Sequence, residues 1–246
     1  MSFEPEKYLN SISLDCVVFG FHNNQLKVLL LKMKFSHEWA LPGGFVQQDE
    51  SVETAAARVL QERTGLDNIF LKQFKVFSDP QRSKMNPAIK DLVESGSNPN
   101  LEWFDQRFIT IGFYALVDFT KALPTPDLFS EIAEWKNIGE IENLMLDHNL
   151  ILQKALNTLR LQLNYQPIGY NLLPNKFTMP ELQKLYETIL SKTLDRQLGL
   201  QLVLQPFVGK HLCKFNGDGR ALRNLLCEFM DLRHQLIMWD DPVEQP

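Results

Sequence analysis

Positions 59, 62 and 63 lie on one predicted helix and have a spacing that could support metal chemistry. Residues at i, i+3 and i+4 share one face of an α-helix, so carboxylates there could converge on a divalent ion that activates water. The sequence places Val59, Glu62 and Arg63 at these positions. Magnesium requires several hard oxygen ligands, and two like unit charges ~4 Å apart repel by roughly 4 kcal/mol at an effective dielectric near 20. One carboxylate beside a permanent cation is therefore a poor magnesium site.

The helix that carries these residues is predicted to follow a glycine-rich loop. Pro42, Gly43 and Gly44 permit a tight turn and a close approach of the backbone to a ligand. Gly65 is predicted to end the helix. The three-and-four spacing of a buried helix face is shown by Val52, Ala55, Ala56, Val59 and Leu60.

Residues 39–66 resemble the Nudix box. The lead-in at 39–46 matches, and so do the specified positions Gly44, Glu50, Arg58, Leu60, Glu62, Gly65 and Leu66. Val59 and Arg63 stand where the family has glutamates that bind the metal ions acting on a pyrophosphate. The resemblance implies a retained Nudix fold without its hydrolytic centre, so we expect no catalytic residue, no metal and no cofactor.

A second interpretation keeps hydrolysis. Val59 would then be a core residue and Arg63 a solvated one, with catalysis supplied by Glu50 or Glu53. In an active enzyme Glu62 and Glu50 would be the catalytic candidates, Glu62 the metal ligand, and Mg²⁺ or Mn²⁺ the cofactor. We expect instead that Glu50 tightens the loop, and that Arg58 and Glu62, four residues apart, form a structural ion pair.

Composition restricts the class of protein. The chain has 246 residues, of which 44% are hydrophobic and 22% charged, as is usual for soluble proteins of one large or two modest domains. Its three cysteines are sparse and odd in number, which predicts no disulfide framework and a cytoplasmic location. No secretory signal and no run of ~20 apolar residues is seen, so no membrane partner is expected. The net charge of −5 argues against a uniformly basic nucleic-acid-binding surface.

The remaining elements follow from periodicity and turn residues. Strands at 13–21 and 26–33 are predicted to form a hairpin through the asparagine-containing turn 22–25. A long polar excursion at 78–106, with a helical turn near 89–94, is predicted to be a lid or an interface insert. Further strands are predicted at 71–77, 107–117 and 130–138.

A helix is predicted to start at Asp147, a good N-cap residue, and to form a linker over 146–164. Two interpretations of Asp147 and His148 are open: a catalytic pair, or a capping aspartate beside a surface histidine, which we favour. The apolar stripe of this helix is Leu150, Ile151, Ala155, Leu156, Leu159 and Leu163.

A second helix is predicted after residue 177. Thr178 is its N-cap, Pro180 stands in its first turn and Glu181 completes a capping box. The segment 176–190 resembles the first helix of the winged-helix domain that follows degenerate Nudix domains in bacterial transcription regulators. The resemblance weakens after Arg196, because no basic residue occurs between Arg196 and Lys210. The DNA-binding residues that it implies are Lys176, Thr178, Lys192 and Arg196.

Together these resemblances imply an α/β (α+β) protein. A Nudix α/β/α sandwich with a mixed sheet would occupy 1–145, the linker helix 146–164, and a winged-helix-like domain 165–246. The implied function is a homodimeric, ligand-responsive transcriptional regulator that binds operator DNA and senses a pentose or an ADP-ribose-like nucleotide sugar. The alternatives are a Nudix hydrolase of nucleoside diphosphate derivatives with relocated metal ligands, and a protein-interaction module. The expected ligand-binding residues are Trp39, Gly43, Gly44, Phe45, Arg58, Glu62 and Arg63.

Overall fold

The computed structural model describes residues 4–194, apart from 35, 83–102, 105, 167 and 175–176. The predicted helical turn at 89–94, two of the predicted DNA-binding residues, Lys176 and Arg196, and the chain beyond residue 194 lie outside the described residues. In the described part of the chain, no helix combines the length and the apolar character needed to cross a membrane.

Seven strands of the described chain form one mixed sheet. β1 (Tyr8–His22) and β2 (Gln25–Met33) form the predicted hairpin, whose turn residues Asn23 and Asn24 both have positive φ, at 50° and 58°. The other strands are β3 (Trp39–Ala40), β4 (Gly43–Gln47), β5 (Phe70–Phe77), β6 (Ile109–Val117) and β7 (Ser130–Asn137). The order is β3-β2-β1-β6-β5, with β4 on β1 and β7 on β2, and only the β1–β6 pair is parallel.

Capping groups fix both ends of α1 and the start of α4, and Gly65 and Thr178 are the predicted ones. The Ser51 hydroxyl accepts from the Thr54 amide at the start of α1, and Gly65, with φ +69°, ends that helix. At the start of α4, Thr178 and Glu181 form the predicted capping box. The helices are α1 (Val52–Thr64), α3 (His148–Leu163) and α4 (Met179–Leu190), with 3₁₀ turns η1 (Pro5–Lys7), η3 (Ile138–Glu140) and η4 (Ile168–Leu172).

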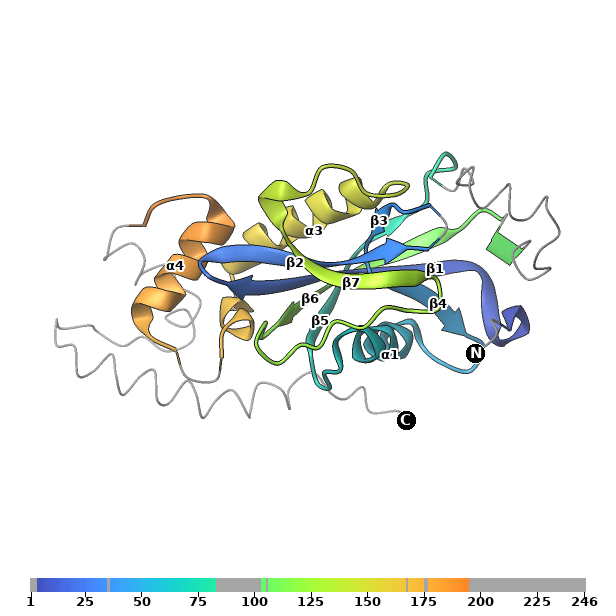
Figure 1. Ribbon diagram of the computed structural model, residues 1–246, viewed down its shortest axis with the longest axis horizontal. Coiled ribbons are helices and arrows are strands. Elements are labelled where there is room, and N and C mark those ends of the chain that lie inside the picture. The colour runs from blue at the N-terminus through green and yellow to red at the C-terminus, as the bar shows by residue number, and fades with distance from the viewer. Residues whose placement is uncertain are drawn as a thin grey trace, which may run out of the picture. The chain divides into compact units, whose positions relative to one another are not determined.

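The sheet is covered on both faces. Successive side chains of a strand point to opposite faces, and β1 sends Val17 and Phe19 into the cluster under α3 but Cys16 and Val18 into the cluster under α1. Figure 1 shows α1 and α3 on opposite sides of the sheet. Burial of each large apolar side chain contributes about 1.5–3 kcal/mol, and the arrangement is the predicted α/β/α sandwich.

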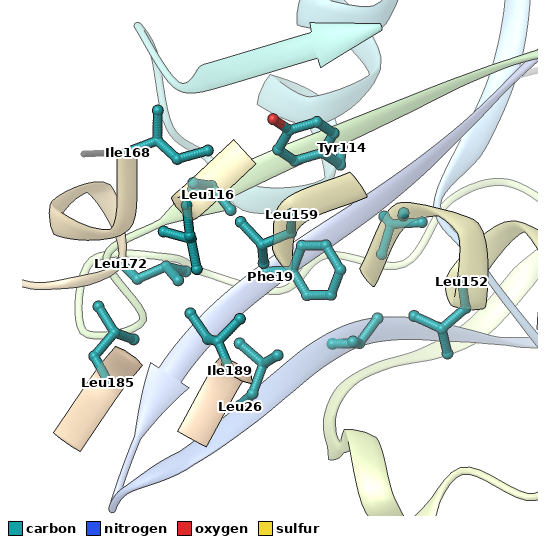
Figure 2. Close-up of a cluster of buried hydrophobic side chains, with 14 of the residues drawn as sticks. Phe19, Leu26, Tyr114, Leu116, Leu152, Leu159, Ile168, Leu172, Leu185 and Ile189 are labelled. Carbon is teal, nitrogen blue, oxygen red and sulfur yellow. The ribbon is translucent and has the colours of Figure 1, made fainter. Parts of the chain in front are cut away.

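The helix α3, which the sequence analysis predicted as a linker, packs on the sheet as one layer of this sandwich. Its buried face includes Leu152 and Leu159, and Figure 2 shows these side chains in one cluster with Phe19 of β1 and Ile189 of α4. The helix α4 belongs to the same compact unit as the sheet. The boundary of a separate domain at residue 165 stays a prediction.

One buried polar group in this cluster has no hydrogen bond. The hydroxyl of Tyr114 has no partner within the described residues, and burial of the ring raises the pKa of Tyr114 to about 12. A buried hydroxyl without a partner reduces stability by about 1–3 kcal/mol. The ring itself packs between Phe70 and Phe74 at centroid distances of 5.9 and 6.3 Å.

We therefore expect Tyr114→Phe to raise the free energy of unfolding by about 1 kcal/mol, because it removes the unpaired hydroxyl and keeps the ring. Urea denaturation followed by tryptophan fluorescence measures the change. The matched control is Tyr165→Phe, since Tyr165 is 75% exposed and its substitution should leave stability unaltered. A loss of stability in Tyr114→Phe would contradict the assignment of an unpaired hydroxyl.

Candidate functional site

An ion pair holds the loop before α1 to the helix. The guanidinium of Arg58 donates to both carboxylate oxygens of Glu50, at 2.6 and 3.1 Å, and to the Phe45 carbonyl oxygen at 3.0 Å. Glu50 also accepts from the Gln47 amide at 2.8 Å. The expected pair with Glu62 is present but longer, at 3.4 Å. Glu50 thus tightens the loop, as predicted, and both of its carboxylate oxygens accept hydrogen bonds within the loop and helix.

Val59 fills the space beneath the glycine-rich loop. Its side chain is 1% exposed, and a Cβ added to Gly44 would lie 2.6 Å from Val59 Cγ2. Gly43 is equally confined, since its Cβ would lie 2.8 Å from the Leu14 carbonyl oxygen on β1. The loop therefore lies directly on β1 and α1, and position 59 is a core position.

Arg63 is held between two carboxylates and is largely buried. Its side chain is 12% exposed, with Nη2 at 3.5 Å from Glu62 and 3.7 Å from Asp127. Its Nε is buried without a hydrogen-bond partner among the described residues. The interpretation in which Arg63 is solvated is therefore wrong. Its backbone carbonyl accepts from the Thr125 amide, which holds the loop that carries Asp127 against the end of α1.

The seven predicted ligand-binding residues are only partly brought together. Arg58 contacts Phe45 and Glu62, and Gly44 contacts Val59 on the same helix. Trp39 instead packs with the cluster under α3 and lies beneath Lys136, whose Nζ is 4.5 Å from the ring centroid. Ligand contact by these residues stays a prediction.

The ring of Phe45 adjoins an aromatic cluster beside the loop. Its centroid lies 4.7 Å from Trp103, 5.5 Å from Phe108 and 6.1 Å from Tyr8. These residues come from β1, β4 and the segment before β6, and the sequence analysis did not associate them. The cluster supports the side of the loop next to the Glu50–Arg58 pair.

A buried charged cluster lies under the lead-in to the Nudix-box stretch, and sequence reasoning missed it. Arg82, whose side chain is 4% exposed, donates from Nε and Nη2 to the two carboxylate oxygens of Asp147, each at 2.9 Å. The same Nη2 lies 3.4 Å from Oδ2 of Asp15, and Nη1 donates to the Phe108 carbonyl oxygen at 3.4 Å. The bidentate geometry with Asp147 is the stronger of the two ion pairs.

His148 joins this cluster to the loop. Its Nδ1 accepts from the Leu41 amide at 3.0 Å, and its Nε2 lies 3.6 Å from Oδ1 of Asp15. The favoured interpretation is corrected in two respects: the histidine is buried, and Asp147 stands at the N-cap of α3 but its side chain binds Arg82 instead of making a capping hydrogen bond. The catalytic-pair interpretation stays untested. An aspartate within the apolar strand β1 was a signal for such a cluster, because buried carboxylates need partners.

The predicted DNA-binding residues are described in part. The Thr178 hydroxyl and amide are both engaged with Glu181 in the capping box, at 2.8 and 2.6 Å. Lys192 is exposed just after α4. Within the described chain no group of three histidine, cysteine or acidic side chains has an arrangement suited to a metal ion.

Family comparison matches both predicted parts of the chain. The NUDIX domain matches residues 12–155, and the NrtR DNA-binding winged helix domain matches residues 169–197. The chain is 30% identical over 193 residues to the ADPR responsive transcriptional repressor NtrR of Acinetobacter baylyi, covering 76% of this chain and 69% of that protein.

Two further similarities are more limited. The chain is 38% identical to the ADP-ribose pyrophosphatase of Methanocaldococcus jannaschii over 87 residues, which cover 34% of this chain and 52% of that enzyme. The crystal structure of Shewanella oneidensis NrtR complexed with a 27mer DNA is similar in fold, with a TM-score of 0.63 and 23% identity over 86% of this chain and 90% of that chain.

The contact between Gly44 and Val59 is testable by a double-mutant cycle. Gly44→Ala should lower the free energy of unfolding by about 1–3 kcal/mol, because the added methyl group meets Val59 Cγ2 at 2.6 Å. In a Val59→Ala background the same substitution should cost clearly less, since the opposing methyl group is gone. Urea denaturation of the four proteins measures both costs, and equal costs in the two backgrounds would exclude the contact.

The Glu50–Arg58 pair predicts a pH-dependent contribution to stability. Partial burial alone would raise the pKa of Glu50, but hydrogen bonds from Arg58 and the Gln47 amide outweigh it, so the pKa lies below its usual value. A carboxylate whose pKa is lower in the folded state stabilises above its unfolded pKa of about 4.3 and loses that contribution as the pH falls.

Glu50→Gln should therefore lower the free energy of unfolding by about 2 kcal/mol at pH 7. The difference from wild type should shrink as the pH falls below about 4. Denaturation curves of the wild type and the variant at several pH values measure this difference. Glu53→Gln is the control on the same helix, because Glu53 is exposed. A difference that stays constant with pH would contradict a charged role for Glu50.

Proposed function

The chain belongs to the Nudix family, among the regulators that join a Nudix domain to an NrtR-type winged helix, and we propose that it is an ADP-ribose-responsive transcriptional repressor. In this proposal the Nudix domain binds ADP-ribose without hydrolysing it, and binding releases the repressor from operator DNA. The named function of the Acinetobacter relative supports the choice of effector. A repressor acts on chromosomal DNA, so we place the protein in the cytoplasm.

The observation that carries the proposal is the composition of the helix face at 59, 62 and 63. Val59 is buried in the core, and Arg63 brings a permanent positive charge between Glu62 and Asp127. Glu50 is already bound by Arg58. A guanidinium in this position attracts an anionic ligand such as a pyrophosphate by charge-assisted hydrogen bonds, but it repels the divalent ion that hydrolysis requires.

The DNA-binding part of the proposal rests on the winged-helix match at 169–197. We propose a homodimer, because a two-fold symmetric protein presents one reading element to each half of an operator. We propose that Lys192, which lies exposed after α4, contacts phosphate. Lys176 and Arg196 lie outside the described residues and stay candidates from the sequence. Thr178 is the N-cap of α4, and its hydroxyl already donates to and accepts from Glu181. Only the remaining lone pair of that hydroxyl is free for a further hydrogen bond.

Hydrolysis of ADP-ribose is the second candidate function. The identity with an archaeal ADP-ribose pyrophosphatase over 87 residues favours it. It would require metal ligands other than Glu50, which is engaged with Arg58, and would leave Glu62 as the one expected acidic ligand on this helix face. Such a site is poor for magnesium, which seeks near-octahedral oxygen coordination.

We expect ADP-ribose to weaken DNA binding in the presence of EDTA and to remain intact when Mg²⁺ or Mn²⁺ is added. Fluorescence anisotropy with duplex DNA from upstream of the protein's own gene measures release, and chromatography of the nucleotide measures turnover. DNA affinity should also fall steeply with salt, because phosphate contacts release counterions. Turnover that disappears in Glu62→Gln would contradict the sensor and support the hydrolase.

Arg63→Gln should weaken ADP-ribose binding by about 10-fold or more, because it removes a charge-assisted interaction worth about 1.5–3 kcal/mol. Calorimetric titration of the purified protein with ADP-ribose measures the affinity. Arg107→Gln is the matched control, since Arg107 is exposed and donates to the Ser78 carbonyl oxygen away from α1. Equal losses in the two variants would show that the effect is not specific to Arg63.

A further inference from the structure

The lead-in to the Nudix-box loop is hydrogen-bonded to the start of α3 at two points and lies against β1 at a third. The Trp39 carbonyl oxygen accepts from the Met145 amide at 2.8 Å. Two residues further on, the Leu41 amide donates to Nδ1 of His148 at 3.0 Å. A Cβ at Gly43 would meet the Asp15 carboxylate at 2.9 Å, so the loop backbone also lies against that group.

These points of contact share one buried arginine. Asp15, under Gly43, is bound by Arg82, and Arg82 makes its bidentate ion pair with Asp147 at the start of α3. In the neutral His148 ring, Nδ1 accepts a hydrogen bond, so the proton lies on Nε2, which faces Asp15 at 3.6 Å. The cluster holds two carboxylates and one guanidinium, so among the described residues Arg82 contacts both carboxylates but balances only one of the two negative charges.

The backbone that enters α3 is strained at this point. Leu146 has φ +50°, in the left-handed region that a leucine seldom adopts, and it is immediately followed by Asp147. Such a conformation persists only where surrounding contacts impose it. Here the contacts are the Asp147–Arg82 ion pair and the hydrogen bonds of Met145 and His148. The start of α3 is therefore held in place by the same groups that support the loop.

The other end of α3 is fixed to the first helix of the winged-helix match. Arg160 donates from Nε to the Ile189 carbonyl oxygen at 2.7 Å and from Nη2 to the Ser191 hydroxyl at 3.1 Å. Leu159 and Leu163 pack in one cluster with Leu185 of α4. Figure 2 shows Leu159, Leu185 and Ile189 within this cluster. The 16-residue helix thus contacts the loop at its start and α4 at its end.

We propose that Arg82 is a positioning residue through which ADP-ribose on the Nudix-box loop alters the placement of α3 and thereby the winged helix. This inference rests on the proposed function, and it names the group that couples the two sites. A ligand that shifts the loop at residues 41–44 displaces Asp15, which lies against Gly43. It also changes the hydrogen bond from the Leu41 amide to Nδ1 of His148. Because Arg82 divides its donors between Asp15 and Asp147, that shift is passed to the strained entry of α3.

The test compares ADP-ribose affinity with and without bound DNA, because coupling between two sites is the ratio of these affinities and is reciprocal. The wild type should show a ratio of about 5–150-fold, measured by calorimetry and by anisotropy with duplex DNA from upstream of the gene. Arg82→Lys retains the buried charge but loses the bidentate fork. In this variant, the affinity for ADP-ribose alone and the affinity for DNA alone should each stay within about 2-fold of the wild type. The ratio of the ADP-ribose affinities with and without DNA should fall to about 2-fold.

Arg107→Lys is the matched control, because this exposed arginine contacts the Ser78 carbonyl oxygen and no group of the cluster, and it should keep the wild-type ratio. An Arg82→Lys protein that keeps the full ratio overturns this inference alone. A wild type that fails to bind ADP-ribose or DNA overturns the proposed function as well. The two failures are thus distinguished by the wild-type measurements.

Hydrogen exchange of the wild type tests the inference without any substitution. Addition of ADP-ribose should change the exchange of the Leu41 amide, which donates to His148, and of the Ile151 amide, which donates to the Asp147 carbonyl oxygen. The Lys121 amide, which donates to the Asp118 carbonyl oxygen in the turn after β6, lies outside α1, the loop and α3 and serves as the internal reference. Unaltered exchange at Ile151 in a protein that binds ADP-ribose would overturn the role of the α3 entry.

Discussion

The structure depends on the close approach of a glycine-containing loop to the strand and helix beneath it. Gly43 lies against the backbone of β1 and Gly44 against Val59, with no room for a Cβ at either position. Because protein interiors are close-packed, this contact decides where the loop runs and which groups can reach it. The Glu50–Arg58 pair then closes the loop onto α1 from the solvent side.

Three arginines of the described chain hold carboxylates in ion pairs. Arg58 binds Glu50, Arg63 stands between Glu62 and Asp127, and Arg82 stands between Asp15 and Asp147. A guanidinium is a permanent cation with directional donors, so it can neutralise carboxylates without a bound metal. In the proposed sensor, these ion pairs would leave an anion-binding surface without the Lewis acid on which pyrophosphate hydrolysis depends.

The helix α3 connects the two halves of the described chain because it is shared between them. Its apolar face is buried by the sheet on one side of the Nudix fold and by η4 and α4 towards its end. A helix packed in this way moves as a body, since core contacts resist local deformation. A flexible linker would instead have left the first helix of the winged-helix match independent of the sheet.

The sequence by itself determined the local structure. Strand alternation, the Asn23–Asn24 turn, the Ser51 and Thr178 caps and the helix stop at Gly65 are all set by short-range backbone and side-chain preferences. The resemblance to the Nudix box singled out the valine and arginine at positions 59 and 63, and helical spacing places them on one face with Glu62.

Only the tertiary structure decided the partners of the charged residues that are far apart in the chain. Arg82 meets Asp15, 67 residues earlier, and Asp147, 65 residues later, so no local pattern could reveal the cluster. Local preference even suggested a capping role for Asp147 and a surface position for His148, and burial overrode both. Long-range ion pairs depend on how strands and helices are packed, and that packing is set by the whole core rather than by any one segment.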